Sequence, residues 1–599
     1  MTINKTLAII TVSLILISCQ TSNQKTNSEK QQTSLSSAKI ELSQLVDDYT
    51  RESFQFSPIS ATFQGVREYN DQFSPKINQK NRDKRFAFQK KYLNKVNKID
   101  DSKLSGQDLL TYKIFKSSRE DEIQSYNFPD HLIPINQMYG MHNFYAVLGS
   151  GQSAQPFNNE EDYRNFIKRS VGFSRWMDSL VDSMKSGIKQ GVVLPDSIVK
   201  KLIPQLKAHV VTNIKDSVFY QPLNNLPDLI KKDSQLIADY ENSIENVIIP
   251  AYRKVHQFLL NEYASHARQS VGLSELPNGR SWYEFMIKTH TTLPLTAEEI
   301  HQFGLSEVER ILSEMKKVKQ QVKFEGDMSA FFEFLRTDDQ FYFDKPEQLV
   351  AAYQNIKSKI DATLPKLFDV FPKADYVVKA VPDFKAASSA GAYYESPAPD
   401  GSRPGVFFIN THNLRSQPKF LMETLSIHEA APGHHFQIAI QQEVQGLPNF
   451  RKYGGYTVFS EGWALYAESL GKELGLFSDP YMWYGRLVDE QLRAMRLVVD
   501  TGIHAFGWSR EKAIQYMLDN SSMASSDVEA EVERYIVIPG QALAYKVGQR
   551  SIRQLREKAE SQLENKFDVK KFHTQILIDG ALPIPVLEDK IEQWIETQK

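Results

Sequence analysis

The chain has 599 residues and a formal net charge of −2, with 71 Lys and Arg residues against 73 Asp and Glu residues. Hydrophobic residues make up 41% of the sequence, which is close to the average for soluble globular proteins and excludes wholesale disorder. The balanced charge and the lack of a long basic run argue against a nucleic-acid partner. The low numbers of glycine (28) and proline (26) disfavour a many-stranded β architecture and favour helices.

The first residues have the pattern of a secretory signal peptide. Lys5 precedes an apolar run over residues 7–17, which is too short for a bilayer-spanning helix of about 20 residues. The run ends in Leu-Ile-Ser-Cys19, which resembles the lipobox of bacterial lipoproteins, and Cys19 is the only cysteine. The resemblance implies a signal peptide over residues 1–18 and a membrane contact through a lipid on Cys19. It implies a protein of the cell envelope, with Gln20 favouring the outer membrane; an ordinary secreted protein is the alternative.

The rest of the chain is predicted to be mainly helical. Residues 19–38 are polar and lack periodicity, which indicates a flexible tether. Thr296 and Glu299 have the spacing of a capping box at the start of a helix. Apolar residues recur at helical spacing in three further segments, 160–186, 242–265 and 486–500.

Strand signals are sparse, and the clearest covers residues 405–411 after a turn-rich segment. We therefore expect a mainly α protein with a small sheet. A soft boundary near residue 290 is expected to separate an N-terminal helical half, 39–290, from a C-terminal half, 291–599, that carries the chemistry.

Three of the thirteen histidines fall in one short segment, His428-Glu-Ala-Ala-Pro-Gly-His434-His435. The segment resembles the zinc-binding pattern H-E-x-x-H, in which a helix places two imidazoles one turn apart and the glutamate activates the metal-bound water. On a regular helix of about 100° per residue, His428 and His434 would lie on roughly opposite faces. Pro432 and Gly433 can break the helix and bring His434 back beside His428.

The spacing leaves open which of the two adjacent histidines faces a metal. His435 lies nominally on the face of His428, but about 10.5 Å further along the helix axis. A histidine cluster at a kinked helix end, without a metal, is the alternative to a metal site.

A metal site of this kind needs a third ligand, usually an acidic side chain from a following helix. Glu461 begins the apolar segment Glu-Gly-Trp-Ala-Leu-Tyr-Ala-Glu, and Glu468 ends it. Glu461 is the candidate ligand, although an acidic residue is also favourable at a helix start for its charge alone. Glu468, two turns further on, is the competitor and is more typical of a residue that supports a ligand or lies at the surface.

These segments form an ordered series that resembles the bacterial family known as domain of unknown function 885, from about residue 40 to the end. The further matching segments are Asp400–Thr411, Asp500–Ser509 and Arg534–Tyr545. The family is similar to helical zinc peptidases of the gluzincin type, which include angiotensin-converting enzyme. The resemblance implies a large helical zincin-like fold with a small antiparallel sheet and a deep substrate groove.

The resemblance also implies a role for each matching residue. Zn²⁺ would be the cofactor, bound by His428, His434 and Glu461. Glu429 would be the general base, and Tyr535 would stabilise the oxyanion. For Tyr535, a helix-packing aromatic is the alternative.

The substrate contacts are less specific. Arg534 and His504 are candidates for substrate binding, although His504 could equally be a core histidine. The strand 406–410 would be the edge strand that pairs with an extended peptide substrate, with an ordinary buried strand as the alternative. Arg493, Arg496 and Arg534 are candidates to bind a substrate carboxylate, so endo-, carboxy- and dipeptidyl cleavage all stay open.

The expected function is a zinc-dependent metallopeptidase that hydrolyses short peptides at the cell envelope with a metal-activated water. One alternative is an envelope lipoprotein that binds peptides or metal without catalysis. Glu429 argues against it, because a binding protein needs no base beside the ligands. A zinc hydrolase of a non-peptide amide is the other alternative.

Overall fold

The computed structural model describes residues 37–382, 386, 390–398 and 403–599. The predicted signal peptide, Cys19 and the tether up to residue 36 lie outside the described residues. Residues 37–53 already form a helix. Among the described residues, no helix has the length and the apolar character needed to span a membrane.

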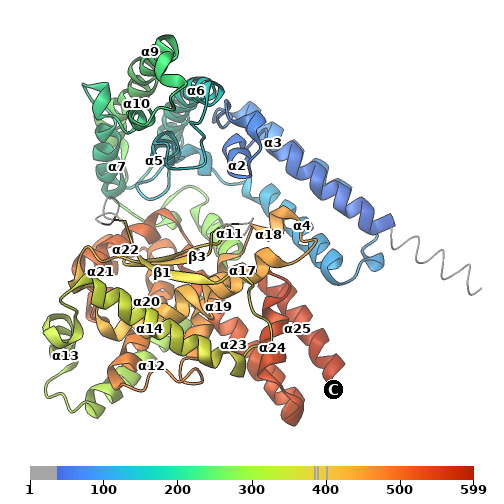
Figure 1. The fold of residues 1–599 in the computed structure, drawn as a ribbon, viewed down its shortest axis with the longest axis vertical. Helices are drawn as coiled ribbons and strands as arrows, with labels where there is room; N and C mark the ends of the chain where they lie inside the picture. The colour runs from blue at the N-terminus through green and yellow to red at the C-terminus, as the bar shows by residue number, and fades with distance from the viewer. Residues whose placement is uncertain (1–36, 383–385, 387–389, 399–402) are drawn as a thin grey trace, which may run out of the picture. The chain divides into compact units, whose positions relative to one another are not determined.

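The protein is mainly helical, as the sequence predicts (Figure 1). The named helices of the first half are α2 (Pro58–Phe63), α3 (Gln79–Val96), α4 (Gly106–Ser125), α5 (Met141–Gly149), α6 (Glu160–Gln190), α7 (Asp196–Ala208), α8 (Gln221–Asn224), α9 (Ser234–Ser243), α10 (Ile249–Asn261) and α11 (Gly279–Thr291).

The second half holds both helices and strands. Its helices are α12 (Ala297–Gln321), α13 (Met328–Thr337), α14 (Pro346–Thr363), α16 (Met422–Leu425), α17 (His434–Glu443), α18 (Asn449–Lys452), α19 (Thr457–Ser469), α20 (Pro480–His504), α21 (Arg510–Asp519), α22 (Ser525–Val537), α23 (Ala544–Leu563), α24 (Val569–Leu577) and α25 (Ile584–Gln598). The predicted capping box is present at the start of α12, where Thr296 accepts the Glu299 N–H and the Glu299 side chain accepts the Thr296 N–H.

The described residues form two units. One consists of residues up to 53 with 84–124, and the other of residues 54–83 with 125–599. In the smaller unit, the ring of Tyr49 packs against Phe88, Tyr92 and Phe115, with ring centroids 5.1–5.2 Å apart. The predicted division near residue 290 stays a prediction.

The small sheet is mixed, which corrects the predicted antiparallel sheet. Its strands are β1 (Tyr376–Ala380), β2 (Ala392–Glu395) and β3 (Gly405–Ile409), in the spatial order β1-β3-β2. β1 runs parallel to β3, whereas β2 runs antiparallel to it. Both outer strands precede β3 in the sequence, and β3 lies between them in the sheet. One of its two pairings is parallel and the other is antiparallel.

β3 contains the strand that was predicted to lie at the edge, and it is the middle strand. Its sequence Gly-Val-Phe-Phe-Ile is apolar at every position after the glycine, and four of its five residues are buried. A continuous apolar run is typical of a strand covered on both faces, whereas an edge strand with one solvated face alternates. The strand that packs against the turn of His428 is the outer strand β2.

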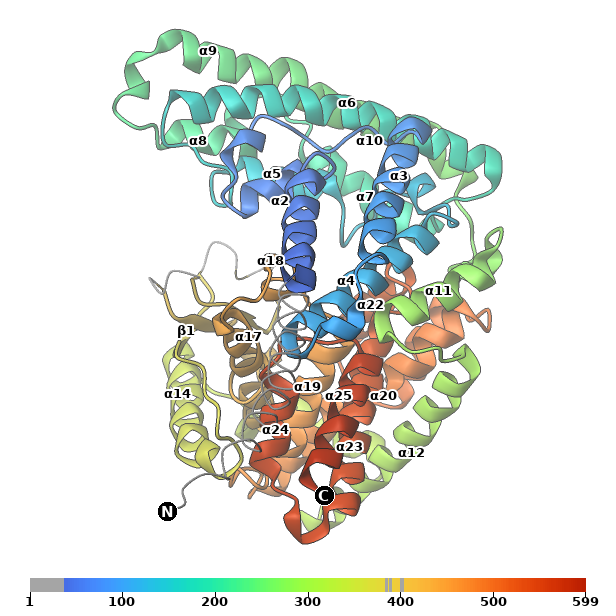
Figure 2. The same ribbon diagram turned by 90° about the vertical axis from the view of Figure 1, so that its right-hand side faces the viewer.

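Three helices of the larger unit surround the histidine segment: α19 packs directly against it, α20 packs against the preceding α16, and α23 packs against α19 (Figures 1 and 2). The backbones of α19 and α23 touch where Gly462 meets Gly548. A Cβ atom on Gly462 would lie 2.5 Å from the carbonyl carbon of Gly548, and a Cβ atom on Gly548 would lie 1.9 Å from the carbonyl oxygen of Val458. Only glycine at both positions allows this approach, which sets the distance between the two helices.

Candidate metal centre

His428 and Glu429 lie in a π-helical turn, Ser426–Ala430, that directly follows α16. The helix ends there, because Ala431 has extended backbone (φ −120°, ψ 132°). The Gly433 N–H then donates a hydrogen bond to the carbonyl oxygen of Ile427 at 2.9 Å, and α17 begins at His434. The helix therefore breaks between the two histidines, as the Pro-Gly pair predicts.

Gly433 is required for this break. A Cβ atom at position 433 would lie 2.0 Å from the carbonyl oxygen of His428 and 2.3 Å from that of Ile427. Both contacts are with backbone atoms that a rotamer change cannot move. The close return of the chain at Gly433 is what lets a histidine six residues away lie beside His428.

The break brings together His428, His434 and Glu461, the predicted ligands. One nitrogen of each histidine and one oxygen of Glu461 all lie within 4.8 Å of one another. Glu461 Oε2 is 3.4 Å from His428 Nε2 and 3.5 Å from His434 Nε2. The two imidazole rings lie with their centroids 4.7 Å apart and their planes almost perpendicular.

The residues present fit a zinc ion. Tetrahedral ligand atoms at about 2.0–2.2 Å from zinc lie about 3.4 Å from one another, which is close to the two nitrogen–oxygen distances. Glu461 Oε2 is buried, and beyond the two histidine nitrogens it has no partner among the described residues. Two nitrogens and one carboxylate oxygen are also a known donor set of catalytic zinc sites, which keep a fourth position open.

Glu468 supports the site from behind. Its Oε1 lies 2.7 Å from His428 Nδ1, and its side chain is almost completely buried. When Nδ1–H donates to this carboxylate, the lone pair of Nε2 is left to face the cluster, so the pairing fixes both the ring orientation and the tautomer. Glu468 is thus a ligand-supporting residue, the first of the two roles that its place in the sequence suggests.

The electrostatics of the cluster favour a bound cation. Burial alone would lower the pKa of His428, but its hydrogen bonds to Glu461 and Glu468 raise it to about 10. Burial would raise the pKa of Glu461, whereas the charge of His434 and hydrogen bonds from both histidines bring it well below its ordinary value. Two carboxylates therefore flank His428 and stabilise positive charge, carried by a proton or by a metal.

His435 is not part of this cluster. Its Nδ1 lies 2.9 Å from the hydroxyl of Tyr394 on β2, and its ring packs against Tyr376 on β1. Burial lowers the pKa of His435 to about 4. The structure therefore brings His434, and not its neighbour, beside His428 and Glu461.

Tyr535 is fully buried in α22. Its hydroxyl donates to Glu531 Oε2 at 2.5 Å and accepts a hydrogen bond from Arg496 Nε at 3.2 Å. Arg534 binds the same oxygen of Glu531 at 3.0 Å and also donates to Gln541. The hydroxyl of Tyr535 is thus already engaged on both sides.

His504 is buried at the end of α20, and both of its ring nitrogens are bonded within the protein. Nδ1 accepts the Leu273 N–H at 3.1 Å, and Nε2 lies 2.9 Å from the carbonyl oxygen of Tyr535. Burial lowers the pKa of His504 to about 3, so the ring is neutral and donates from Nε2. This arrangement is that of a core histidine that joins α20 to α22.

Tyr545 is the last residue of the family-matching segment Arg534–Tyr545, and no role was predicted for it. It lies in α23 one turn before Gly548, and Glu461 directly precedes Gly462, so the glycine contact brings Tyr545 near Glu461. Burial and the charge of Glu461 raise the pKa of Tyr545. The guanidinium of Arg496 lies 4.3 Å from the centre of the Tyr545 ring. The side chain of Tyr545 is only partly buried.

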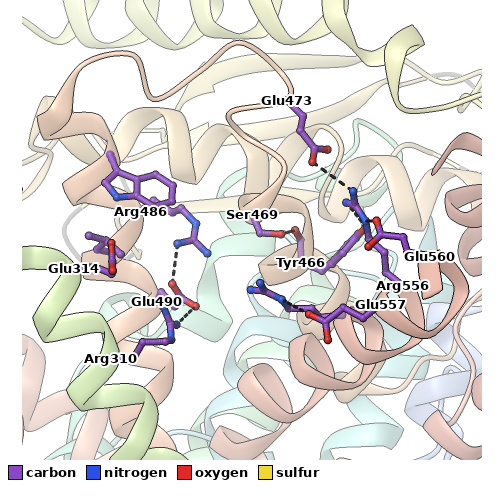
Figure 3. A pocket seen from close by; sticks show the side chains of 13 residues that line it. Arg310, Glu314, Tyr466, Ser469, Glu473, Arg486, Glu490, Arg556, Glu557 and Glu560 are labelled. Atoms are coloured by element: carbon purple, nitrogen blue, oxygen red, sulfur yellow. Dashed lines mark hydrogen bonds and ion pairs between the residues drawn. The ribbon is translucent and has the colours of Figure 1, made fainter. Parts of the chain in front are cut away.

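A cavity of about 400 Å³ lies elsewhere along α19 (Figure 3). α19 turns Tyr466 and Ser469 into it, whereas Glu461 and Glu468 face the histidines. The cavity is lined mostly by ion pairs, such as Arg486 with Glu490 and Arg556 with Glu560. None of the predicted site residues lines it, and the predicted deep groove stays a prediction.

Comparison with known proteins identifies relatives without an assigned activity. One solved structure, "The crystal structure of the putative lipoprotein from Colwellia psychrerythraea", superimposes with a TM-score of 0.84 at 29% identity, over 94% of this chain and 99% of that chain. A second solved structure, "The structure of a putative lipoprotein of unknown function from Shewanella oneidensis", shares the fold, with a TM-score of 0.69 at 19% identity over 92% and 99% of the two chains. No curated protein matches significantly. Residues 58–591 match the family described as "Bacterial protein of unknown function (DUF885)", and the chain therefore belongs to this family.

Proposed function

We propose that the protein is a zinc-dependent metallopeptidase that hydrolyses short peptides at the cell envelope. The observation that carries the proposal is the cluster of His428, His434 and Glu461, with two nitrogen–oxygen distances of 3.4 and 3.5 Å and a glutamate behind the first histidine. Metal-ligand spacing, a buried carboxylate oxygen whose partners among the described residues are the two histidines, and a supporting carboxylate coincide at one place. A structural histidine cluster would need none of the three.

Zn²⁺ held by these three residues would supply Lewis-acid activation of a water molecule and of a carbonyl oxygen. Glu429 is the general base of the proposed reaction, because it follows His428 in the same turn and its side chain is partly exposed. Its carboxylate accepts a proton from the attacking water, whose hydroxyl adds to the carbonyl carbon of the peptide. Glu429 then delivers that proton to the leaving amine as the carbon–nitrogen bond breaks.

A tyrosine hydroxyl is the proposed donor to the oxyanion, and two tyrosines compete for this role. Tyr535 was the prediction, but its hydroxyl donates to Glu531 inside the core. Tyr545 is partly exposed and is held near Glu461 by the contact of α19 with α23. We assign the role to Tyr545 on these grounds, with Tyr535 as the residue that orients the Glu531 and Arg496 side chains beside it.

The outer strand β2 is the proposed binding edge for an extended peptide. It packs against the turn of His428 and pairs with β3 on one side. A peptide that adds to such an edge gains main-chain hydrogen bonds whatever its side chains are. The proposed attachment to the envelope is consistent with the relative of 29% identity, which is described as a lipoprotein.

The proposal is tested by peptide hydrolysis with the zinc-loaded protein and its Glu429→Gln variant. We expect the wild type to cleave short peptides and the variant to keep one zinc per chain but lose turnover by a factor of about 10²–10⁴. Glu557→Gln, which changes an exposed glutamate paired with Arg553, serves as the control substitution. Near-full peptide hydrolysis by Glu429→Gln would contradict the mechanism, and hydrolysis of non-peptide amides alone would point to the zinc amidohydrolase instead.

A further inference from the structure

Two guanidinium groups beside the metal cluster share a single carboxylate. Glu531 Oε2 accepts hydrogen bonds from Arg496 Nε at 3.2 Å, from Arg496 Nη2 at 3.0 Å and from Arg534 Nη2 at 3.0 Å. The Tyr535 hydroxyl donates to the same oxygen. The carboxylate of Glu531 therefore neutralises only one of the two guanidinium charges. Glu531, Arg496 and Arg534 together keep a net charge of about +1.

The neighbouring charged groups of α20 do not remove this excess. Arg493, one turn before Arg496, has its own partner in Asp489, at 2.8 Å. Asp500, one turn after Arg496, accepts hydrogen bonds from the Tyr283 hydroxyl and from the Gly540 N–H. The excess charge thus belongs to Arg496 and Arg534.

Arg496 also carries a donor without an acceptor. Its Nη1 is buried and has no hydrogen-bond partner among the described residues, and the whole residue is 6% exposed. An unsatisfied buried donor costs free energy, and it costs more when the group is charged. A charged donor without an acceptor, next to an excess of positive charge, indicates that an anionic partner belongs to this place.

Tyr545 connects the guanidinium pair to the metal cluster, and part of the pair keeps contact with solvent. The Arg496 guanidinium lies over the ring of Tyr545, which the glycine contact of α19 with α23 holds near Glu461. The side chains of Arg534 and Glu531 are 13% and 23% exposed, so a ligand reaches the pair through Arg534, with Arg496 buried behind it. A peptide that extends from the metal cluster towards Tyr545 would meet this pair.

We propose that Arg496 and Arg534, next to the ring of Tyr545, form a subsite for the free C-terminal carboxylate of the substrate. Guanidinium groups recognise carboxylates through paired, charge-assisted hydrogen bonds, and a partly buried pair does so more strongly than an exposed lysine. The inference rests on the proposed peptidase function and narrows it to an exopeptidase that cleaves near the C-terminus. Among the cleavage types that the sequence leaves open, the inference selects cleavage near the C-terminus.

The test compares two peptides that differ only at the C-terminus, a free acid and its amide, with the zinc-loaded wild-type protein. We expect the free acid to be cleaved with a kcat/KM about 10- to 100-fold higher than that of the amide. The Arg534→Gln variant should lose that preference while keeping its zinc content. The matched control is Arg510→Gln, because Arg510 binds Glu529 and Glu533 of the same helix α22, away from Tyr545.

A binding measurement separates the subsite from the chemistry. The inactive Glu429→Gln variant should bind the free acid more tightly than the amide, by a similar factor, in calorimetry. This second measurement needs no change to Arg534, so it holds even where Arg534→Gln folds poorly. Equal cleavage and equal binding of acid and amide would overturn the subsite and leave the peptidase intact, whereas no cleavage of either peptide by zinc-loaded wild type would overturn the proposed function itself.

Discussion

At the scale of single residues, Gly433 decides whether the two histidines can meet. An alanine there would put its Cβ within 2.0 Å of the His428 carbonyl oxygen, so the turn must open. We expect Gly433→Ala to lower the free energy of unfolding by about 3 kcal/mol or more and to weaken zinc binding. Urea unfolding and zinc titration measure both effects. Gly455→Ala is the control, since its nearest atom would be Ser460 Oγ at 3.9 Å; equal effects of the two substitutions would contradict the argument.

Glu468 should control the zinc affinity without touching the metal. Glu468→Gln removes the charge that holds His428 Nδ1–H at 2.7 Å, and outer carboxylates of this kind contribute about 10- to 100-fold to metal affinity. We therefore expect the Kd for zinc to rise by about that factor. Glu473→Gln, a partly exposed glutamate that pairs with Arg556, is the matched control. An unchanged Kd in Glu468→Gln would show that the pairing does not support the ligand.

Asp500 should make the stability of the protein depend on pH. Burial raises its pKa from 3.8 to about 7, against the opposing hydrogen bonds from Tyr283 and Gly540. Between pH 4 and pH 7 the folded chain therefore holds a proton that the unfolded chain has lost, so this stabilising contribution is complete below pH 4 and is lost as the pH rises through 7.

The magnitude follows from the shift in pKa. As Asp500 ionises between pH 5 and pH 8, the free energy of unfolding should fall by up to about 3 kcal/mol. The Asp500→Asn variant should not show this fall. Urea unfolding of both proteins at the two pH values measures it, with the exposed Asp519→Asn as control. The same decline in Asp500→Asn and wild type would assign the pH dependence to another group.

At the scale of elements, the contact of α19 with α23 positions Glu461, the third proposed ligand. Gly462 follows Glu461 directly, and any side chain there would meet the backbone of Gly548. We expect Gly462→Ala to push the helices apart, to lower the melting temperature and to weaken zinc binding as Glu461 moves. Calorimetry and zinc titration test this. A variant that loses stability but binds zinc with unchanged affinity would show that the contact does not position Glu461.

The sequence predicts the helices better than the sheet, and the reason is physical. The capping box of α12 and the helical apolar spacing of α6 and α20 are local patterns, and the structure confirms them. The place of β3 between β1 and β2 depends on pairing with strands that precede it in the chain, and no local pattern records that. The apolar sequence of β3 nevertheless carried the signal of a middle strand.

At the scale of the whole molecule, the candidate site is assembled from segments that lie far apart in the chain. Residue type and spacing selected His428 but left open the choice between His434 and His435 and between Glu461 and Glu468. The family resemblance implied His434 and Glu461, and the structure brings these two together with His428. The place of Tyr545 and the unpaired donor of Arg496 became visible only through packing. Tyrosines and arginines are common, and their partners here are set by the packing of α20, α22 and α23.

Zinc binding should also stabilise the larger unit, because the unfolded chain does not hold the three ligands together. At a free zinc concentration of about 100 times Kd, the expected gain is about 2.7 kcal/mol. The melting temperature of the wild type should rise with zinc and fall with a chelator. The His434→Ala variant should show neither change, and an equal rise in that variant would indicate zinc binding elsewhere.

The most direct test of the central claim is the zinc content of the purified wild type and of the His434→Ala and His435→Ala variants. We predict one zinc per chain in the wild type and in His435→Ala, and loss of zinc in His434→Ala, because only His434 lies beside His428 and Glu461. No zinc in the wild type at saturating metal, or loss in His435→Ala with retention in His434→Ala, would contradict the account.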